Sequence, residues 1–142
     1  TGEDIQQVCT TQTQNKIFDM VRAVTEKNQK RALDLYYDLL TLKEPPMRIL
    51  FLLAKQFRQI CLTKKMSQEG LSQTEIASKL GVPSFVVRNL ASCARSYTVE
   101  ELENAVRDFV DAEEAVKTGT LGDVLSVELL IVKYSSARAV RA

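Results

Sequence analysis

Hydrophobic residues along this chain recur at helical spacing, and no stretch keeps the strict alternation of apolar and polar residues that is typical of strands. The pattern predicts an all-α fold, a compact multi-helix bundle with no sheet. We expect the first two full helices to form an antiparallel pair around a turn at Asn28-Gln29. The apolar positions of this pair are Ile17, Met20, Val21 and Val24, followed by Ala32, Leu35, Tyr36, Leu39 and Leu40.

The most apolar element follows the break Glu44-Pro45-Pro46. Prolines suit the first turn of a helix, where missing amide donors cost little, and Pro45 disfavours helical backbone at Glu44. The sequence therefore predicts a helix from Pro46 to about Gln68, ended by Gly70. Because residues 49–54 are all apolar, they cover every side of the helix, and we expect other helices to surround it.

Capping residues set the boundaries of the later helices. Ser72, with Glu75 three residues on, forms a capping box that opens a short helix closed by Gly81. Thr98 with Glu101 forms a second box, which opens a long helix. The other predicted boundaries are a helix from Pro83-Ser84 to about Ser96, the end of the long helix at Lys117-Thr118-Gly119, and a last helix capped by Asp123 and ending near Ser135.

Residues 75–90 fit the spacing of a helix-turn-helix motif, with a glycine at the turn and apolar packing positions on both sides. The same spacing also makes a compact three-helix corner in any all-α domain. If the motif reads duplex DNA, the outward face of its second helix would present Ser84, Phe85, Arg88, Asn89 and Ser92 to the major groove. Only two positive charges lie on that helix, however, and phosphate neutralisation normally needs several.

Composition excludes many enzyme classes. The chain has no histidine, so no histidine general base, Ser-His or Cys-His dyad, or usual zinc ligand set is available. The three cysteines (Cys9, Cys61 and Cys93) are widely spaced and odd in number, which favours reduced thiols in packing positions. The glycines of residues 117–122 have the wrong spacing for a phosphate-binding loop. We predict no catalytic, cofactor or metal site.

Length and polarity favour one soluble domain, and the reduced thiols expected from the cysteine pattern favour the cytoplasm. The 142 residues are 45% hydrophobic and 26% charged, and no apolar run approaches a membrane span. Since the chain starts at Thr1 without a signal segment, we interpret it as a fragment of a longer protein. Residues 1–12 are expected to be the tail of a preceding domain, with a short helix over 4–9 and a linker over 10–14. Residues 13–135 are expected to form the helical domain, and 136–142 a frayed tail.

Charge is unevenly distributed along the chain. Residues 45–97 carry eight Lys/Arg against two Asp/Glu, whereas residues 98–142 carry five against nine. The basic segment either faces nucleic acid or an acidic partner, or simply packs against the acidic segment in one fold. The carboxylates of residues 100–114 are interpreted as a solvated helix face rather than paired acid–base groups. Tyr36, Tyr37 and Tyr97 either stack on bases or are half-buried packing residues.

The order of several short motifs resembles the C-terminal region of the delta subunit of the bacterial DNA polymerase III clamp loader. The resemblance covers roughly residues 3–134. It rests on Ile17-Phe18-Asp19-Met20-Val21, Lys30-Arg31-Ala32-Leu33, Glu44-Pro45, Arg48-Ile49-Leu50, Leu53-Ala54-Lys55-Gln56-Phe57-Arg58, Glu75-Ile76-Ala77, Leu80-Gly81, Glu100-Glu101-Leu102, Lys117-Thr118-Gly119 and Glu128-Leu129-Leu130.

This resemblance implies a collar domain, the helical part through which delta, delta-prime and the gamma or tau subunits associate into a ring for DNA replication. It implies that residues 1–12 end a lid domain and that contact with the sliding clamp belongs to an N-terminal domain outside this chain. It also implies that delta has no ATPase site, although the complete protein is part of a DNA polymerase complex. Primer–template DNA would be contacted weakly, with Lys117, Thr118 and Thr120 as the best candidates. The aromatic residue that could stack on a base there is missing.

Overall fold

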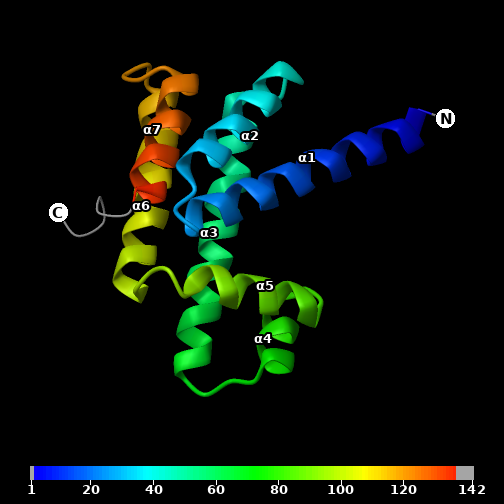
Figure 1. The fold of residues 1–142 in the computed structure, drawn as a ribbon, viewed down its shortest axis with the longest axis vertical. Helices are drawn as coiled ribbons and strands as arrows, with labels where there is room; N and C mark the ends of the chain where they lie inside the picture. Colours follow the sequence, from blue (N-terminus) through cyan, green and yellow to red (C-terminus); the bar gives the residue numbers. More distant parts are fainter. Residues whose placement is uncertain (1, 137–142) are drawn as a thin grey trace.

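The computed structural model describes residues 2–136, with side chains described from residue 13 onward, and this range contains seven helices and no strand. The predicted all-α fold class is confirmed. Five helices form the body of the molecule, and the two shortest form a lobe at one end (Figure 1). In order, they are α1 (Gly2–Thr25), α2 (Gln29–Thr41), α3 (Pro46–Gln68), α4 (Gln73–Leu80), α5 (Ser84–Ala94), α6 (Val99–Lys117) and α7 (Asp123–Ser135).

Helices α1 and α2 form the expected antiparallel pair. The chain reverses at Lys27, which has a positive φ of 63°, and Asn28 caps α2 by accepting a hydrogen bond from the Arg31 amide at 3.3 Å. The predicted apolar stripes face inward. Of the nine positions, only Leu40 is incompletely buried.

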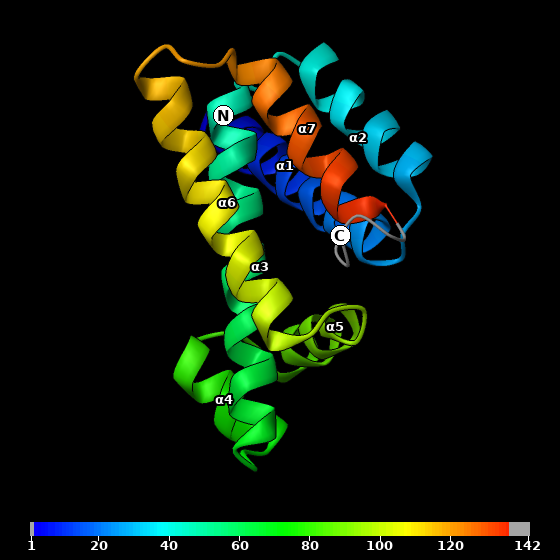
Figure 2. The same ribbon diagram turned by 90° about the vertical axis from the view of Figure 1, so that its left-hand side faces the viewer.

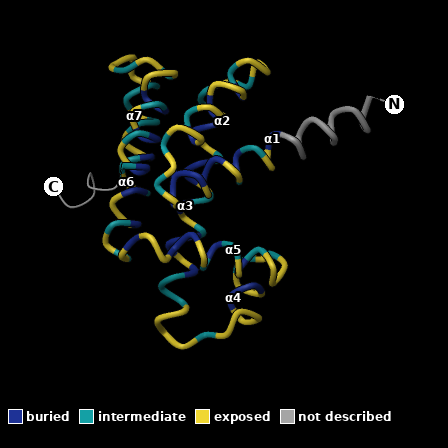
Figure 3. The backbone as a smooth tube through the Cα atoms, viewed as in Figure 1, coloured by how far each residue is buried: buried dark blue, intermediate teal, exposed yellow. Residues whose placement is uncertain are grey.

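Helix α3 runs through the centre of the body and contacts α1, α4, α5, α6 and α7 (Figure 2). Its predicted limits, Pro46 and Gln68, are confirmed. Phe57 lies at the middle of the core, 1% exposed, with its ring centre 5.1 Å from that of Phe109 and 6.1 Å from those of Tyr97 and Tyr134. Burial is therefore concentrated where α3 meets the other long helices (Figure 3).

The expectation that α3 is surrounded on every side is wrong at one position. Ile49, Leu50, Leu53 and Ala54 are buried, but Phe51 is 58% exposed. The five helices that contact α3 leave the side that carries Phe51 uncovered. The open side of α3 therefore carries an apolar side chain.

Both capping boxes are confirmed. Ser72 Oγ accepts a hydrogen bond from the Glu75 amide at 3.2 Å, and the Glu75 carboxylate accepts one from the Ser72 amide at 3.1 Å. The same reciprocal pair joins Thr98 and Glu101. Gly81 ends α4 in the left-handed conformation, with φ 70°. The short helix and the long one therefore begin at the residues that the sequence specifies.

Two predictions near helix ends are wrong. Helix α1 continues from Gly2 to Thr25 without a break, so the expected short helix over 4–9 and linker over 10–14 are parts of one helix. Asp123 is the first residue of α7 rather than its cap. Gly122 holds the cap position, while the Asp123 carboxylate accepts a hydrogen bond from the next amide, that of Val124, at 2.7 Å. The expected frayed segment, apart from Ser136, lies outside the described residues.

The lobe formed by α4 and α5 has its own small core. Ile76, Ala77 and Val87 are buried together, beneath a shell of four partly buried residues: Met66, Leu71, Leu80 and Val82. The remaining buried hydrophobic residues belong to the larger cluster in the body. The lobe packs on the far end of α3, opposite the α6–α7 turn (Figure 1).

Candidate interaction surfaces

The α6–α7 turn holds the residues proposed for DNA contact at one exposed end of the molecule (Figure 1). Lys117, Thr118 and Thr120 are all exposed. Lys117 Nζ lies 3.1 Å from the carboxylate of Glu113, and the two threonine hydroxyls lie 3.0 Å apart. The structure thus brings the three residues together, although Glu113 partly neutralises the lysine charge.

The second helix of the helix-turn-helix-like segment, α5, does present the predicted outward face. Ser84, Arg88 and Ser92 are exposed, Phe85 is 60% exposed, and Asn89 is only half exposed. Val87 and Leu90 are buried, as the motif requires. The same packing serves as a three-helix corner with α3, so these contacts fit both interpretations of the segment.

The basic and acidic segments meet along α3 and α6. Lys65 Nζ lies 2.8 Å from the Glu103 carboxylate, and this hydrogen bond raises the pKa of Lys65. The interpretation that the two segments pack against each other is confirmed for this pair. The carboxylates of α6 are otherwise exposed or paired within the fold, as Asp108 is with Lys133 Nζ at 2.7 Å.

The tyrosines and thiols singled out in the sequence are mostly packing residues. Tyr36 and Tyr97 are 0% and 3% exposed, so neither ring can stack on a base, and burial raises the pKa of each phenol. Tyr37 is exposed, and its hydroxyl donates a hydrogen bond to Glu128. Cys61 and Cys93 are buried free thiols whose pKa values are raised by burial. The side chain of Cys9 lies outside the described range.

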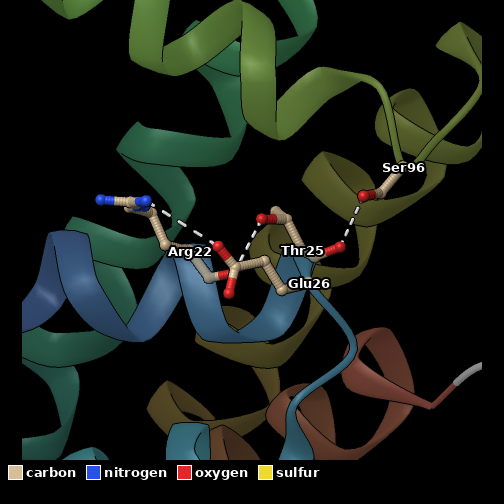
Figure 4. A network of polar contacts seen from close by, with 4 residues as sticks. All are labelled: Arg22, Thr25, Glu26 and Ser96. Atoms are coloured by element: carbon tan, nitrogen blue, oxygen red, sulfur yellow. Dashed lines mark hydrogen bonds and ion pairs between the residues drawn. The ribbon is translucent and has the colours of Figure 1, made fainter.

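Polar contacts at the end of α1 join this helix to the α5–α6 turn (Figure 4). Ser96 Oγ donates a hydrogen bond to the main-chain oxygen of Thr25 at 2.5 Å, and Thr25 Oγ1 donates to that of Arg22 at 2.9 Å. The Arg22–Glu26 ion pair beside them is 3.8 Å long and more than half exposed. It therefore adds little stability. This network fixes the α5–α6 turn on α1, and nothing in it resembles a ligand site.

The surface also carries large exposed apolar side chains, whose outward orientation the helical pattern did not predict. One group lies on α2 and α7 and comprises Tyr37, Val124, Leu125 and Leu129. Another lies on α3 and α6 and comprises Phe51, Leu62 and Val110. The spacing of Leu125 and Leu129 places them on one side of α7. Sequence alone could not show whether that side faces inward.

Metal-ligand clusters and membrane-spanning helices are both lacking among the described residues. Across residues 13–136, no group of three or more histidine, cysteine or acidic side chains is placed to hold a metal ion. None of the described helices has the length and hydropathy needed to cross a membrane. By fold and surface, the described residues form an all-α helical domain whose surface carries exposed apolar side chains.

Comparisons with known proteins give the family. Residues 14–134 match the family model described as DNA polymerase III delta subunit, C-terminal domain, and the chain belongs to this family. It is 29% identical over 133 residues to DNA polymerase III subunit delta of Bacillus subtilis (strain 168), covering 94% of this chain and 38% of that protein. It superposes on the solved Bacillus subtilis DNA clamp loader delta protein with a TM-score of 0.81 and 30% identity, covering 86% of this chain and 36% of that one. The chain thus spans little more than a third of these relatives.

Proposed function

We propose that this domain is an oligomerisation scaffold of the DNA polymerase III clamp loader: the collar that holds delta in the ring loading the sliding clamp on primed DNA. The observation that carries the proposal is the match of residues 14–134 to the delta C-terminal domain. Exposed apolar side chains on α2, α3, α6 and α7 support it, because a domain buried in a ring needs apolar surface on its sides.

On this proposal, the domain does no chemistry. Its partners are the gamma or tau and delta-prime subunits, which it meets through their own collar domains in the cytoplasm. The sliding clamp is contacted only by an N-terminal part of delta that this chain does not include. Primer–template DNA is touched weakly at Lys117, Thr118 and Thr120, whose exposure in the α6–α7 turn supports this role.

The test is assembly. The chain is mixed with the gamma or tau and delta-prime subunits of the same organism, and the products are analysed by native mass spectrometry and size-exclusion chromatography. A stoichiometric complex containing one copy of the chain is the expected result. If the subunits assemble with each other but never include this chain, the scaffold proposal fails.

A helix-turn-helix DNA-binding function is the second candidate, favoured by the exposure of Ser84, Phe85, Arg88 and Ser92 on one face of α5. It predicts sequence-selective binding of duplex DNA at physiological salt, which Arg88→Ala and Asn89→Ala would abolish. Fluorescence anisotropy with labelled duplexes distinguishes it from the scaffold, for which DNA binding is weak, unselective and steeply reduced by salt.

A further inference from the structure

A groove of about 320 Å³ lies between α3 and α6, on the open side of the two helices. These helices run antiparallel, as shown by the contacts of Lys65 with Glu103 and of Phe57 with Phe109. The buried thiol of Cys61 lines the groove. We call this depression the α3–α6 groove, and its other lining residues are Arg58, Leu62, Lys65, Glu103, Val106 and Arg107.

The α3–α6 groove has more positive than negative charge. Its lining includes three cationic side chains, Arg58, Lys65 and Arg107, and one carboxylate, Glu103. Glu103 is already paired with Lys65 at 2.8 Å. Arg58 and Arg107, one on each helix, are both exposed and form no ion pair with any residue of the range 13–136. Two guanidinium groups thus remain available for an anionic partner.

Apolar side chains continue the two edges of the groove. On α3, Phe51, Arg58 and Leu62 recur at helical spacing and are all exposed. On α6, Val110 lies one turn beyond Arg107 and is 51% exposed. Each edge therefore alternates a guanidinium with a large apolar group. An isolated domain gains nothing by exposing such a pair of edges, whereas an amphipathic helix would cover both kinds of group.

We propose that the α3–α6 groove docks an acidic amphipathic helix of a neighbouring clamp-loader subunit, with carboxylates on Arg58 and Arg107 and apolar side chains on Leu62 and Val110. The inference rests on the proposed scaffold function and names the surface and the partner chemistry. A nucleic-acid backbone fits the groove less well. Phosphates need several cations, whereas here one of three is neutralised, and exposed apolar groups would be left facing a charged strand.

Charge reversal tests the docking site. Arg58→Glu, Arg107→Glu and the double variant are titrated by isothermal titration calorimetry with the complete gamma or tau and delta-prime subunits of the same organism. Because both substituted positions are exposed, circular dichroism should show an unchanged fold in all three variants. We expect each reversal to weaken binding to one neighbour at least about tenfold, and the double variant to weaken it further. Lys79→Glu, an equal change of charge on α4, serves as the matched control and should leave the affinity within about twofold.

Leu62→Ala gives a readout that does not depend on charge. It removes apolar contact area without adding a repulsive group, and about a fivefold loss of affinity for the same neighbour is expected. If the unaltered chain joins the complex and the two arginine variants join it equally well, the docking proposal is overturned while the scaffold function stands. If the unaltered chain does not join at all, the scaffold function and the docking site both fall. If only binding of labelled primer–template DNA is lost in the variants, the groove is a nucleic-acid site and the proposal is overturned.

Discussion

The phenol of Tyr97 donates a hydrogen bond of 2.7 Å to the main-chain oxygen of Tyr134, and so joins the α5–α6 turn to the last turn of α7. Lys27 completes this junction. Its Nζ lies 4.1 Å from the centre of the Tyr97 ring and donates to the same Tyr134 oxygen at 3.1 Å. The α1–α2 turn, the α5–α6 turn and the end of α7 are therefore held at one point, beside the Ser96–Thr25 contact.

Tyr97→Phe should reveal what this hydrogen bond contributes. The ring and its packing against Phe57 stay, while the main-chain oxygen of Tyr134 keeps, among the described residues, the hydrogen bond from Lys27. We expect the free energy of unfolding to fall by about 1 to 2 kcal/mol, measured by urea denaturation. Tyr37→Phe, which removes the same atom from an exposed ring, is the control and should change stability by less than about 0.5 kcal/mol. If Tyr97→Phe and Tyr37→Phe lowered the free energy of unfolding equally, the hydrogen bond of Tyr97 to Tyr134 would contribute no more stability than an exposed one.

Stability should also fall at alkaline pH. Burial raises the pKa values of Tyr36, Tyr97 and Tyr134 above the ordinary value of about 10. Above about pH 10 the unfolded chain therefore binds fewer protons than the folded one, and the free energy of unfolding falls as pH rises, by at most about 1.4 kcal/mol per pH unit for each group. The stabilisation is complete below about pH 10.

Lys27 acts in the opposite direction, because burial lowers its pKa and its charge costs stability until it is lost. Because three tyrosines oppose one lysine, we still expect the free energy of unfolding to fall as the pH rises above about 10. Urea midpoints measured from about pH 8 to about pH 11, with tyrosinate absorbance followed in parallel, test this prediction. In Tyr97→Phe, the urea midpoint should fall less steeply with rising pH than in the unaltered chain. A midpoint that does not change with pH would contradict the raised pKa values of the three tyrosines.

Local signals in the sequence were enough to define most helices. Proline at the start of α3, the two capping boxes and Gly81 act through backbone geometry within a few residues, so they can be recognised without the fold. The polar stretch 10–14 misled the prediction, because threonine and glutamine lower helix propensity only slightly and the surrounding helix continues through them.

Features of the candidate surfaces depend on which helices become neighbours. The apolar run of α3 does not say which side remains open, so the exposure of Phe51 could not be predicted. Nor does composition show that Glu103 pairs with Lys65 while Arg58 and Arg107 have no such partner among the described residues. These relationships arise only when α6 packs antiparallel on α3. The sequence signal for contact between α3 and α6 was the charge imbalance between residues 45–97, which are basic, and residues 98–142, which are acidic.

The α4–α5 lobe should open before the body does. Its core has only three fully buried residues, and α4 depends on the capping box at Ser72. Ser72→Ala removes the acceptor for the Glu75 amide and should cost about 1 kcal/mol, with faster hydrogen exchange confined to the amides of α4. Ser78→Ala, at an exposed position within α4, is the matched control and should be neutral or slightly stabilising. Exchange that accelerates equally throughout the body would mean that the lobe is not a separate unit.

Substitutions of two phenylalanines of α3 should distinguish a residue needed for folding from a residue needed for binding a partner. Phe57 is 1% exposed among three aromatic rings, so Phe57→Ala leaves a cavity and is expected to lower the free energy of unfolding by about 3 to 5 kcal/mol. Phe51, six residues earlier in α3, is 58% exposed. Phe51→Ala should therefore change the free energy of unfolding by less than about 1 kcal/mol, yet should weaken binding to the neighbour that covers the α3–α6 groove. Denaturation and calorimetry on both variants give the comparison. If Phe51→Ala destabilised the domain as much as Phe57→Ala, the open side of α3 would be part of the folding core rather than a surface kept for a partner.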